Sequence, residues 1–127
     1  MQLLERREQP AASAPRAAPA SRDGTGDETA LRCRVCEAVV ASARDRVERF
    51  GAHAHERVNP SGFTFVIGCF SRADGVLGVG DESDEFPWFP RHRWRCVVCA
   101  SCGTHLGWHF RQGGNEFIGL ILARLLD

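Results

Sequence analysis

The residues best suited to chemistry in this sequence are its six cysteines, four of which form two C-x-x-C pairs. The pairs are "CRVC", with Cys33 and Cys36, and "CASC", with Cys99 and Cys102. Two such pairs can supply the four thiolates of a tetrahedral Zn²⁺ site. Gly103 follows the second pair and suits a turn with positive φ. The spacing predicts one structural zinc ion per chain, with no open position for a substrate.

Two disulfides are the alternative for these four cysteines, and an intracellular location disfavours them. We predict a cytoplasmic protein, because no segment approaches the roughly 18 apolar residues of a membrane span and the N-terminus lacks the apolar core of a signal peptide. The other two cysteines, Cys69 and Cys96, lie in apolar segments, where a small buried side chain is the usual role. A redox nucleophile at either position is the alternative interpretation.

The three tryptophans form a second group with chemical potential. Trp88 and Trp94 lie in the proline-punctuated stretch "FPWFPRHRW", and Trp108 lies in "HLGWHF". A loop sequence places the first of these indoles at the surface rather than in a core. Trp94 and Trp108 flank the second cysteine pair, which would hold them in register. We expect three rigid aromatic faces to form an open box that suits a small flat ring or a cation.

No group of residues has a catalytic pattern, and we predict a binding protein rather than an enzyme. His53 and His55 have the spacing of a metal pair, but their polar segment favours solvated side chains. His105 and His109 alternate near the second cysteine pair and are expected to be structural. The acidic residues of "DESDE" (81–85) are expected to be solvated.

Charge and composition limit the possible partners. Sixteen basic residues, all arginine, balance sixteen acidic ones, so there is no net attraction to nucleic acid or anionic lipid. Nucleic acid is therefore not expected as a partner, despite the local stretch "RHRWR". Residues 1–29 are rich in Ala, Pro, Arg, Ser and Gly and are predicted to form a disordered tail. Residues 30–127 are predicted to form one domain.

The elements that must position these residues are predicted to be mainly strands. Aromatic and β-branched residues favour strands at 63–70, 92–98, 105–110 and 116–122. The Gly-Gly of "RQGGN" predicts a tight hairpin between the last two.

The remaining segments are less regular. Residues 37–50 have helical propensity, but strand and loop are preferred because the segment leaves a metal knuckle. Residues 73–87 are expected to be mostly loop, and the only helix is expected within 122–127. The fold class is therefore mainly β with little helix.

Taken in order, these motifs resemble the thalidomide-binding (CULT) domain family of cereblon, and most closely its stand-alone bacterial-type members. The order is C-x-x-C, "NPSG", "SDEFPWFP" followed by Trp94, then C-x-x-CG-x-"HLGWHF" and "FIGLI". The resemblance covers residues 31–126. It implies two antiparallel sheets pinned at a structural zinc site, the β-tent, with Cys33, Cys36, Cys99 and Cys102 as ligands.

The resemblance also implies an activity, which is the capture of cyclic imides. The implied ligands are glutarimide, succinimide and thalidomide-like rings, the cyclised C-terminal Asn or Gln of a protein, and uridine-like rings. The implied ligand-binding residues are Asn59 and Pro60 at the rim, Phe86, Pro87, Trp88, Trp94 and Trp108 around the ring, and Phe110 at the base. The Phe86 carbonyl would accept the imide N–H, and the Trp88 backbone N–H would bind an imide carbonyl.

Three departures from the family pattern matter. Animal cereblons carry histidine where this chain has Phe86, so a side-chain hydrogen bond from that position is lost. Pro87 is less expected; we hypothesise that it biases Phe86 toward an extended backbone and preorganises the loop. Full cereblon also has a Lon-like domain and a docking region for a ubiquitin-ligase adaptor. Neither is recognisable here, so adaptor docking by this chain is not expected.

Two other functional classes compete with imide binding. Methionine sulfoxide reductases of the B type share a related zinc β fold, but neither Cys69 nor Cys96 lies in the Arg-x-Cys-x-Asn context that they need. An aromatic cage for a quaternary ammonium group is the other alternative, with Asp84 and Glu85 as a nearby counter-charge.

Overall fold

The computed structural model describes residues 29–127, and nearly all of the predicted N-terminal tail lies outside this range. The described residues are mainly β, as predicted, and their helical content is limited to 3₁₀ turns such as η2 (Ala43–Asp45) and η3 (Leu122–Arg124). None of the helices within residues 29–127 is long and apolar enough to cross a membrane. The strands are β1 (Ala30–Cys33), β2 (Val39–Ser42), β3 (Ala54–Val58), β4 (Thr64–Phe70), β5 (Val76–Ser83), β6 (Arg93–Cys99), β7 (His105–Gln112), β8 (Asn115–Ile121) and β9 (Leu125–Leu126).

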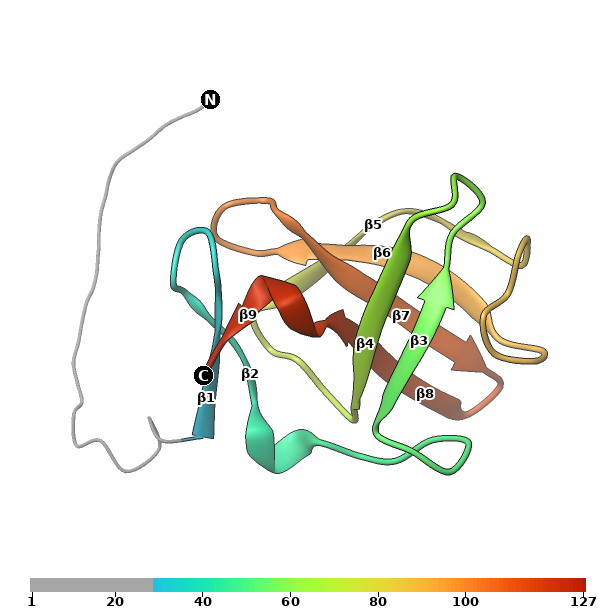
Figure 1. Ribbon diagram of the computed structural model, residues 1–127, viewed down its shortest axis with the longest axis horizontal. Coiled ribbons are helices and arrows are strands. Elements are labelled where there is room, and N and C mark those ends of the chain that lie inside the picture. Colours follow the sequence, from blue (N-terminus) through green and yellow to red (C-terminus); the bar gives the residue numbers. More distant parts are fainter. Residues whose placement is uncertain (1–28) are drawn as a thin grey trace. The chain divides into compact units, whose positions relative to one another are not determined.

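The strands form two antiparallel sheets (Figure 1). The smaller sheet has the order β2-β1-β9, and the larger has the order β3-β4-β8-β7-β6-β5. In chain order, β8 of the larger sheet is followed by η3 and then by β9 of the smaller sheet. The prediction of two antiparallel sheets is therefore confirmed.

Two apolar cores lie on opposite faces of the larger sheet, because successive side chains along a strand point to opposite sides. The first core packs the two sheets together; its buried members are Leu31, Cys33, Val40, Ala41, Phe70, Ala73, Val97, Cys99, Leu106, Leu120 and Leu125. The second core packs the 84–92 loop onto the other face; its buried members are Ile67, Cys69, Phe89, Trp108, Phe110, Phe117 and Ile121. The sheet thus separates a metal-side core from a tryptophan-side core.

The strands predicted from aromatic and β-branched runs are confirmed as β4, β6, β7 and β8. The Gly-Gly hairpin is also confirmed, with Gln112 opposite Asn115 and Gly113 at φ 57°. Residues 37–50 form β2, η2 and loop rather than a long helix, as preferred.

Four strands were not expected from the sequence. Two belong to the smaller sheet: β1, and β9, which together with the 3₁₀ turn η3 takes the place of the helix expected within 122–127. The other two lie at the edges of the larger sheet. Residues 73–87 were predicted to be mostly loop, but β5 occupies Val76–Ser83 at the edge of the larger sheet. Its many small and acidic residues do not indicate a strand. An edge strand with little burial can have this composition, because it needs few large apolar side chains. The polar "GAHAHERV" segment contains β3 at the opposite edge for the same reason.

One glycine of the "HLGW" segment is required by close backbone packing. A Cβ atom at Gly107 would lie 1.9 Å from the Gly119 carbonyl oxygen on the paired strand β8. No other residue permits this approach, which sets the spacing of β7 and β8 beneath Trp108.

Candidate metal centre and aromatic pocket

The four cysteines of the two C-x-x-C pairs meet at one point between the sheets. Their sulfur atoms all lie within 4.8 Å of one another. The Sγ atoms of Cys33 and Cys102 are 3.7 Å apart, and those of Cys36 and Cys99 are 3.6 Å apart. Zn–S bonds of about 2.3 Å in a tetrahedron place sulfurs about 3.8 Å apart. The cluster therefore fits zinc and is too open for disulfides, whose sulfurs lie about 2.05 Å apart.

The two cysteine pairs form matching backbone knuckles. In the first, the Cys33 carbonyl accepts a hydrogen bond of 2.7 Å from the Glu37 N–H; in the second, the Cys99 carbonyl accepts one of 2.8 Å from the Gly103 N–H. Gly103 has a φ of 81°, as predicted for the residue after the second pair. Glu37 holds the equivalent position at φ 65°, a conformation that costs a residue with a Cβ about 1–2 kcal/mol.

The cluster joins the two sheets, because Cys33 ends β1 and Cys99 ends β6. The Cys99 side chain, through a hydrogen bond, is the main cause that lowers the pKa of the Cys33 thiol to about 5. The same hydrogen bond raises the pKa of the Cys99 thiol, so the two cysteines share one proton, with Cys33 as the thiolate. A thiolate is the form that binds metal, so zinc binding would release the shared proton. A zinc ion held by these four sulfurs would cross-link the sheets and have no free coordination position.

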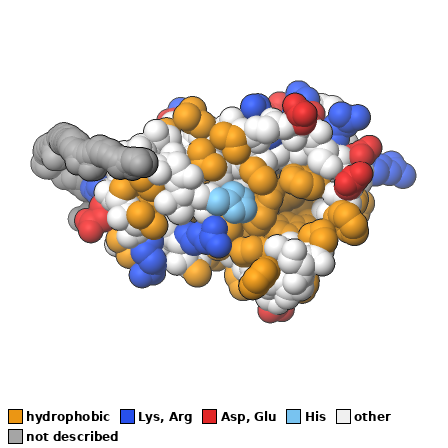
Figure 2. All heavy atoms as spheres, turned by 90° about the horizontal axis from the view of Figure 1, so that it is seen from above, with side chains coloured by type: hydrophobic (Ala, Val, Ile, Leu, Met, Phe, Trp, Pro, Cys, Tyr) orange, Lys and Arg blue, Asp and Glu red, His pale blue; other side chains and the backbone are white. Residues whose placement is uncertain are grey.

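A cavity of about 450 Å³ lies on the other face of the larger sheet. Of the residues predicted to bind a ligand, only Pro87 does not line it. Figure 2 shows a face on which hydrophobic side chains gather over a broad area. The lining residues are Asn59, Pro60, Ser83, Glu85, Phe86, Trp88, Trp94, Cys96, His105, Trp108 and Phe110.

Three lining residues, Ser83, Cys96 and His105, were not expected at the pocket, and Glu85 was expected there only as the counter-charge of a cation cage. Alternation along β6 offered the one usable signal, because Cys96 shares a strand face with the predicted pocket residue Trp94. Ser83 lies close in sequence to Phe86, and His105 to Trp108, but their residue types alone indicate no pocket role.

The walls of the pocket are indole faces rather than indole N–H groups. The Trp88 and Trp108 rings meet at a corner, with centroids 4.5 Å apart and an interplanar angle of 71°. The Trp88 Nε1–H donates to the Val58 carbonyl at 3.1 Å, and the Trp94 Nε1–H donates to the Glu85 carbonyl at 2.6 Å. Because both donors are satisfied within the protein, these two side chains offer a ligand only their π surfaces.

The floor of the pocket belongs to the tryptophan-side core. Trp108 is 8% exposed and Phe110 is 1% exposed. On the neighbouring strand β6, Cys96 pairs with Trp108 and Trp94 pairs with Phe110. The Phe110 ring stacks on Phe117 with centroids 5.1 Å apart. The sheet therefore fixes the floor and one wall, whereas the 84–92 loop supplies the other wall.

The loop that carries Trp88 has an unusual backbone. Phe86 has a φ of 49°, in the left-handed region, and its side chain is 66% exposed. The prediction that Pro87 biases Phe86 toward an extended backbone is therefore wrong. The contacts of Glu85 with Trp94 and of Trp88 with Val58 hold the chain on both sides of Phe86, and they override the local preference.

Asn59 and Pro60 lie at the tip of the β3–β4 hairpin and line the pocket as expected for rim residues. The Asn59 side-chain oxygen accepts hydrogen bonds from the N–H groups of Ser61 (3.0 Å) and Phe63 (2.9 Å). The hairpin turn thus uses the acceptor of this amide, and the Nδ2 group is the part that can donate to a ligand.

The prediction that His53 and His55 are solvated is wrong. Both are partly buried, His55 on β3 and His53 just before it, and both bond backbone carbonyls. His53 Nδ1 lies 3.1 Å from the Val47 oxygen, and His55 Nε2 lies 2.8 Å from the Arg49 oxygen. Each ring also packs edge to face against a phenylalanine: His53 against Phe70 of the metal-side core, and His55 against Phe89 of the tryptophan-side core. These contacts tie the pair to the fold and not to a metal.

His105 combines structural and pocket roles. Its ring packs edge to face on Trp108, with centroids 4.8 Å apart, and its Nε2 lies 3.0 Å from the Gly107 carbonyl oxygen. Burial is the main cause that lowers its pKa below the ordinary value. His105 therefore favours the neutral form beside the pocket.

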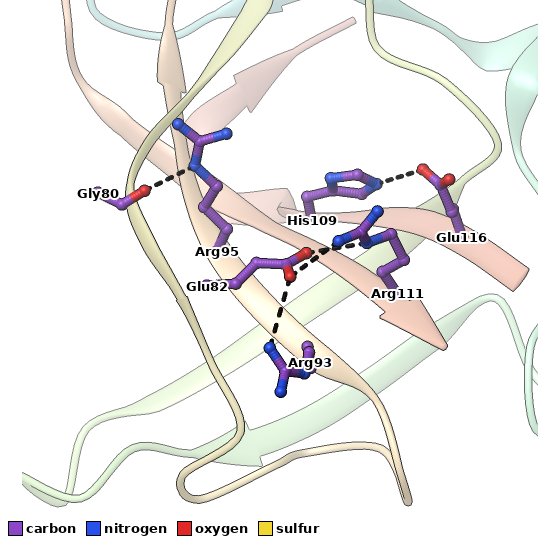
Figure 3. Close-up of polar contacts among 7 residues, drawn as sticks. All are labelled: Gly80, Glu82, Arg93, Arg95, His109, Arg111 and Glu116. Carbon is purple, nitrogen blue, oxygen red and sulfur yellow. Dashed lines mark hydrogen bonds and ion pairs between the residues drawn. The ribbon is translucent and has the colours of Figure 1, made fainter. Parts of the chain in front are cut away.

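The face of β5 to β8 that is opposite the pocket carries a network of charged residues (Figure 3). The Arg111 guanidinium binds the Glu82 carboxylate through two hydrogen bonds of 2.9 Å, which lower the pKa of Glu82. His109 bonds Glu116 at 2.8 Å, consistent with its expected structural role. Glu82 also lies 4.0 Å from Arg93. Glu82 was expected to be solvated, but it is paired with arginines. Its negative charge offsets part of the positive charge of "RHRWR".

The two remaining cysteines differ in accessibility. Cys69 is fully buried, and burial raises its pKa to about 11. Cys96 is half-buried at the pocket; burial also raises its pKa, against a hydrogen bond from the Trp108 side chain. Both environments disfavour the thiolate that a redox nucleophile requires.

These features define a small, mainly β domain with a zinc-type cysteine centre on one side of its main sheet and an aromatic pocket on the other. Within that class, the chain carries a cereblon-like domain. It is 32% identical to the protein named cereblon of Drosophila simulans over 105 residues, which are 74% of this chain and 17% of the relative. It is 32% identical to that of Drosophila melanogaster over 91 residues, 67% of this chain and 15% of the relative.

A third relative, the cereblon of Drosophila grimshawi, is 30% identical over 88 residues, 66% of this chain and 13% of the relative. The chain thus spans about a sixth of the length of the curated relatives it matches. No known family profile matches the sequence. These relatives are insect proteins, and the bacterial-type assignment stays a prediction.

Proposed function

We propose that this domain is a zinc-stabilised, non-enzymatic module that binds cyclic imides in its aromatic pocket. The observation that carries the proposal is the convergence of three tryptophans and Phe110 on one cavity, although they come from a loop and two strands. Two of the indole N–H groups are already bonded to carbonyls, so the walls favour a flat, uncharged ring over a ligand that needs donors there.

The edge of the pocket offers the complementary polar groups. Within residues 29–127, no hydrogen bond uses the Phe86 carbonyl or the Trp88 backbone N–H. An imide presents one donor flanked by two acceptors, and these two free backbone groups match one of each. A ring that lacks the imide N–H would leave a desolvated carbonyl in the loop, which typically costs about 1–3 kcal/mol.

The proposed ligand class includes glutarimide, succinimide and thalidomide-like compounds, the cyclised C-terminal Asn or Gln of a protein, and uridine-like rings. A substrate-receptor role rather than catalysis accords with the similarity to cereblon-named proteins, which are much longer than this chain. We further propose a cytoplasmic location, where the four cysteines would stay reduced and hold Zn²⁺.

The test is a titration of the zinc-loaded full chain, followed by tryptophan fluorescence and calorimetry. We expect glutarimide to quench the fluorescence and bind with one site, and N-methylglutarimide and choline to bind at least tenfold more weakly. Trp94→Ala should abolish binding while leaving the zinc content unchanged. Equal binding of glutarimide and its N-methyl analogue would refute the hydrogen-bonded imide mode.

A cage for quaternary ammonium groups is the second candidate, because Glu85 lines the same pocket as the three tryptophans. Choline separates the two candidates in the same titration. Stronger quenching by choline than by glutarimide, weakened by Glu85→Gln, would favour the cation cage.

The reductase alternative has less support. Cys69 is sealed in the core, and the pKa of Cys96 is raised at the pocket. An assay of methionine sulfoxide reduction with a thiol recycling system should give no turnover. Turnover that disappears in Cys96→Ser would overturn the assignment as a non-enzyme.

A further inference from the structure

An arginine outside the pocket connects the β3–β4 hairpin to the loop that carries Trp88. Arg57 lies on β3, on the partly buried side of a strand whose alternate residues are exposed. Its Nε–H donates to the Trp88 backbone carbonyl at 3.2 Å. Its guanidinium also lies over the Phe89 ring, 4.8 Å from the centroid, and Phe89 is fully buried. One side chain thus contacts two successive residues of the pocket loop.

The same strand holds Trp88 at a second point. The Val58 carbonyl, one residue after Arg57, accepts the hydrogen bond from the Trp88 indole. Trp88 is therefore held through both its backbone and its side chain by neighbouring residues of β3. The next residues, Asn59 and Pro60, form the rim of the pocket. The position of the Trp88 wall is consequently tied to the hairpin that carries the rim.

Arg49 provides a contrast within the same aromatic cluster. Its guanidinium lies over the Phe117 ring at 5.6 Å, and its Nη1 donates to the neighbouring Glu48 carbonyl. It makes a cation–π contact comparable to that of Arg57, but no hydrogen bond to the 84–92 loop within the described residues. The loss of Arg49 would therefore report on stability alone.

We propose that Arg57 is a positioning residue: by holding the Trp88 carbonyl it restricts rotation of the Trp88 backbone, whose N–H, in the preceding peptide, would bind an imide carbonyl. The proposal rests on the proposed function for its effect on affinity. Holding the Trp88 carbonyl fixes the plane of the Trp88–Phe89 peptide, and the indole bond fixes the side chain. With two substituents of its Cα held, Trp88 has little freedom to turn its N–H away from the pocket. Without the Arg57 donor, this half-buried carbonyl loses its partner and the loop is free to rotate.

The binding test uses a matched pair of variants. Arg57→Gln places an amide N–H where the arginine Nε lies, whereas Arg57→Met has the same length and no donor; both lack the guanidinium over Phe89. We expect glutarimide to bind about tenfold more weakly to Arg57→Met than to the parent, and Arg57→Gln to recover most of that loss. The control Arg49→Met should bind like the parent, even where its melting temperature falls.

A readout without ligand separates this proposal from the proposed function. In NMR spectra of the zinc-loaded protein, the Trp88 indole N–H should exchange with solvent several-fold faster in Arg57→Met than in Arg57→Gln, while the Trp94 indole N–H stays unchanged. Faster exchange without glutarimide binding by the parent would retain the positioning role and refute the imide pocket. Equal affinity and equal Trp88 exchange in the two Arg57 variants would overturn the positioning role.

Discussion

The metal centre and the aromatic pocket lie on opposite sides of one sheet and are built in different ways. The metal centre is assembled from two short repeats of the same knuckle, each with two ligands three residues apart. The pocket is assembled from residues of β5, β6, β7, the β3–β4 hairpin and the 84–92 loop. The first site thus depends on local geometry that occurs twice, whereas the second depends on long-range packing at every position.

The difference has an energetic consequence. A zinc ion bound by four thiolates contributes binding free energy directly to folding, since the unfolded chain has no preformed site. The pocket works in the opposite direction, because it keeps large aromatic faces partly open to solvent and holds Phe86 in a left-handed backbone conformation. We infer that a bound metal ion would help to offset the cost of the open pocket and the Phe86 backbone, while the core beneath the pocket stabilises the fold.

The largest expected loss of stability comes from removing one cysteine of the candidate metal centre. Cys36→Ser changes an exposed ligand, so its effect comes through the metal and not through packing. We expect loss of bound zinc and a destabilisation of at least about 4 kcal/mol, measured by elemental analysis and urea denaturation. Cys96→Ser, a half-buried thiol outside the cluster, is the control and should retain one zinc per chain. A folded, zinc-loaded Cys36→Ser protein of parent stability would contradict the four-cysteine site.

A smaller loss of stability is expected from a substitution in the tryptophan-side core, and it should leave the metal centre intact. Phe89 is fully buried, and its ring lies 4.9 Å from Phe110 and 5.1 Å from Phe117 between ring centroids. Phe89→Ala should cost about 3–5 kcal/mol in the free energy of unfolding. Zinc content should stay at the parent level, because the metal lies on the other face of the sheet. Zinc loss in the folded variant would show that the two sides are not separable.

A change at the metal side should raise stability. Glu37 occupies the position of Gly103 in the matching knuckle, with a φ of 65°. Glu37→Gly removes the Cβ from this left-handed residue and should stabilise the protein by up to about 1 kcal/mol, whereas Glu37→Ala should not. Chemical denaturation of the zinc-loaded variants measures both. Equal stability of the Gly and Ala variants would show that the knuckle bears no backbone strain.

The smallest effect concerns pH at the pocket. Burial lowers the pKa of His105 in the folded protein, so the unfolded chain binds the proton more readily. The free energy of unfolding should therefore fall as pH drops from about 6.5 through the folded pKa. Denaturation at pH 7.5 and 6.0 should show a weaker pH dependence in His105→Gln, with zinc content checked at each pH. An unchanged dependence would assign it to other groups.

Much of the fold followed from local patterns. Four strands have enough aromatic and β-branched residues to be predicted, and the Gly-Gly pair marked their hairpin. Strands β3 and β5 could not be predicted, because both are sheet edges with few buried side chains. The same limit explains His53 and His55, which were expected to be solvated. They pack on aromatic rings because the segment at the start of β3 lies against the sheet.

The sequence by itself determined which four cysteines form the candidate metal cluster and which aromatic residues could form a pocket, because C-x-x-C spacing and indole chemistry are properties of neighbouring or single residues. Only the tertiary structure decided which faces the indoles present, which additional residues line the pocket and how Phe86 bends. These features depend on hydrogen bonds between residues far apart in the chain, such as those from Trp88 to Val58 and from Arg57 to Trp88. No local preference encodes such contacts, and at Phe86 they prevail over it.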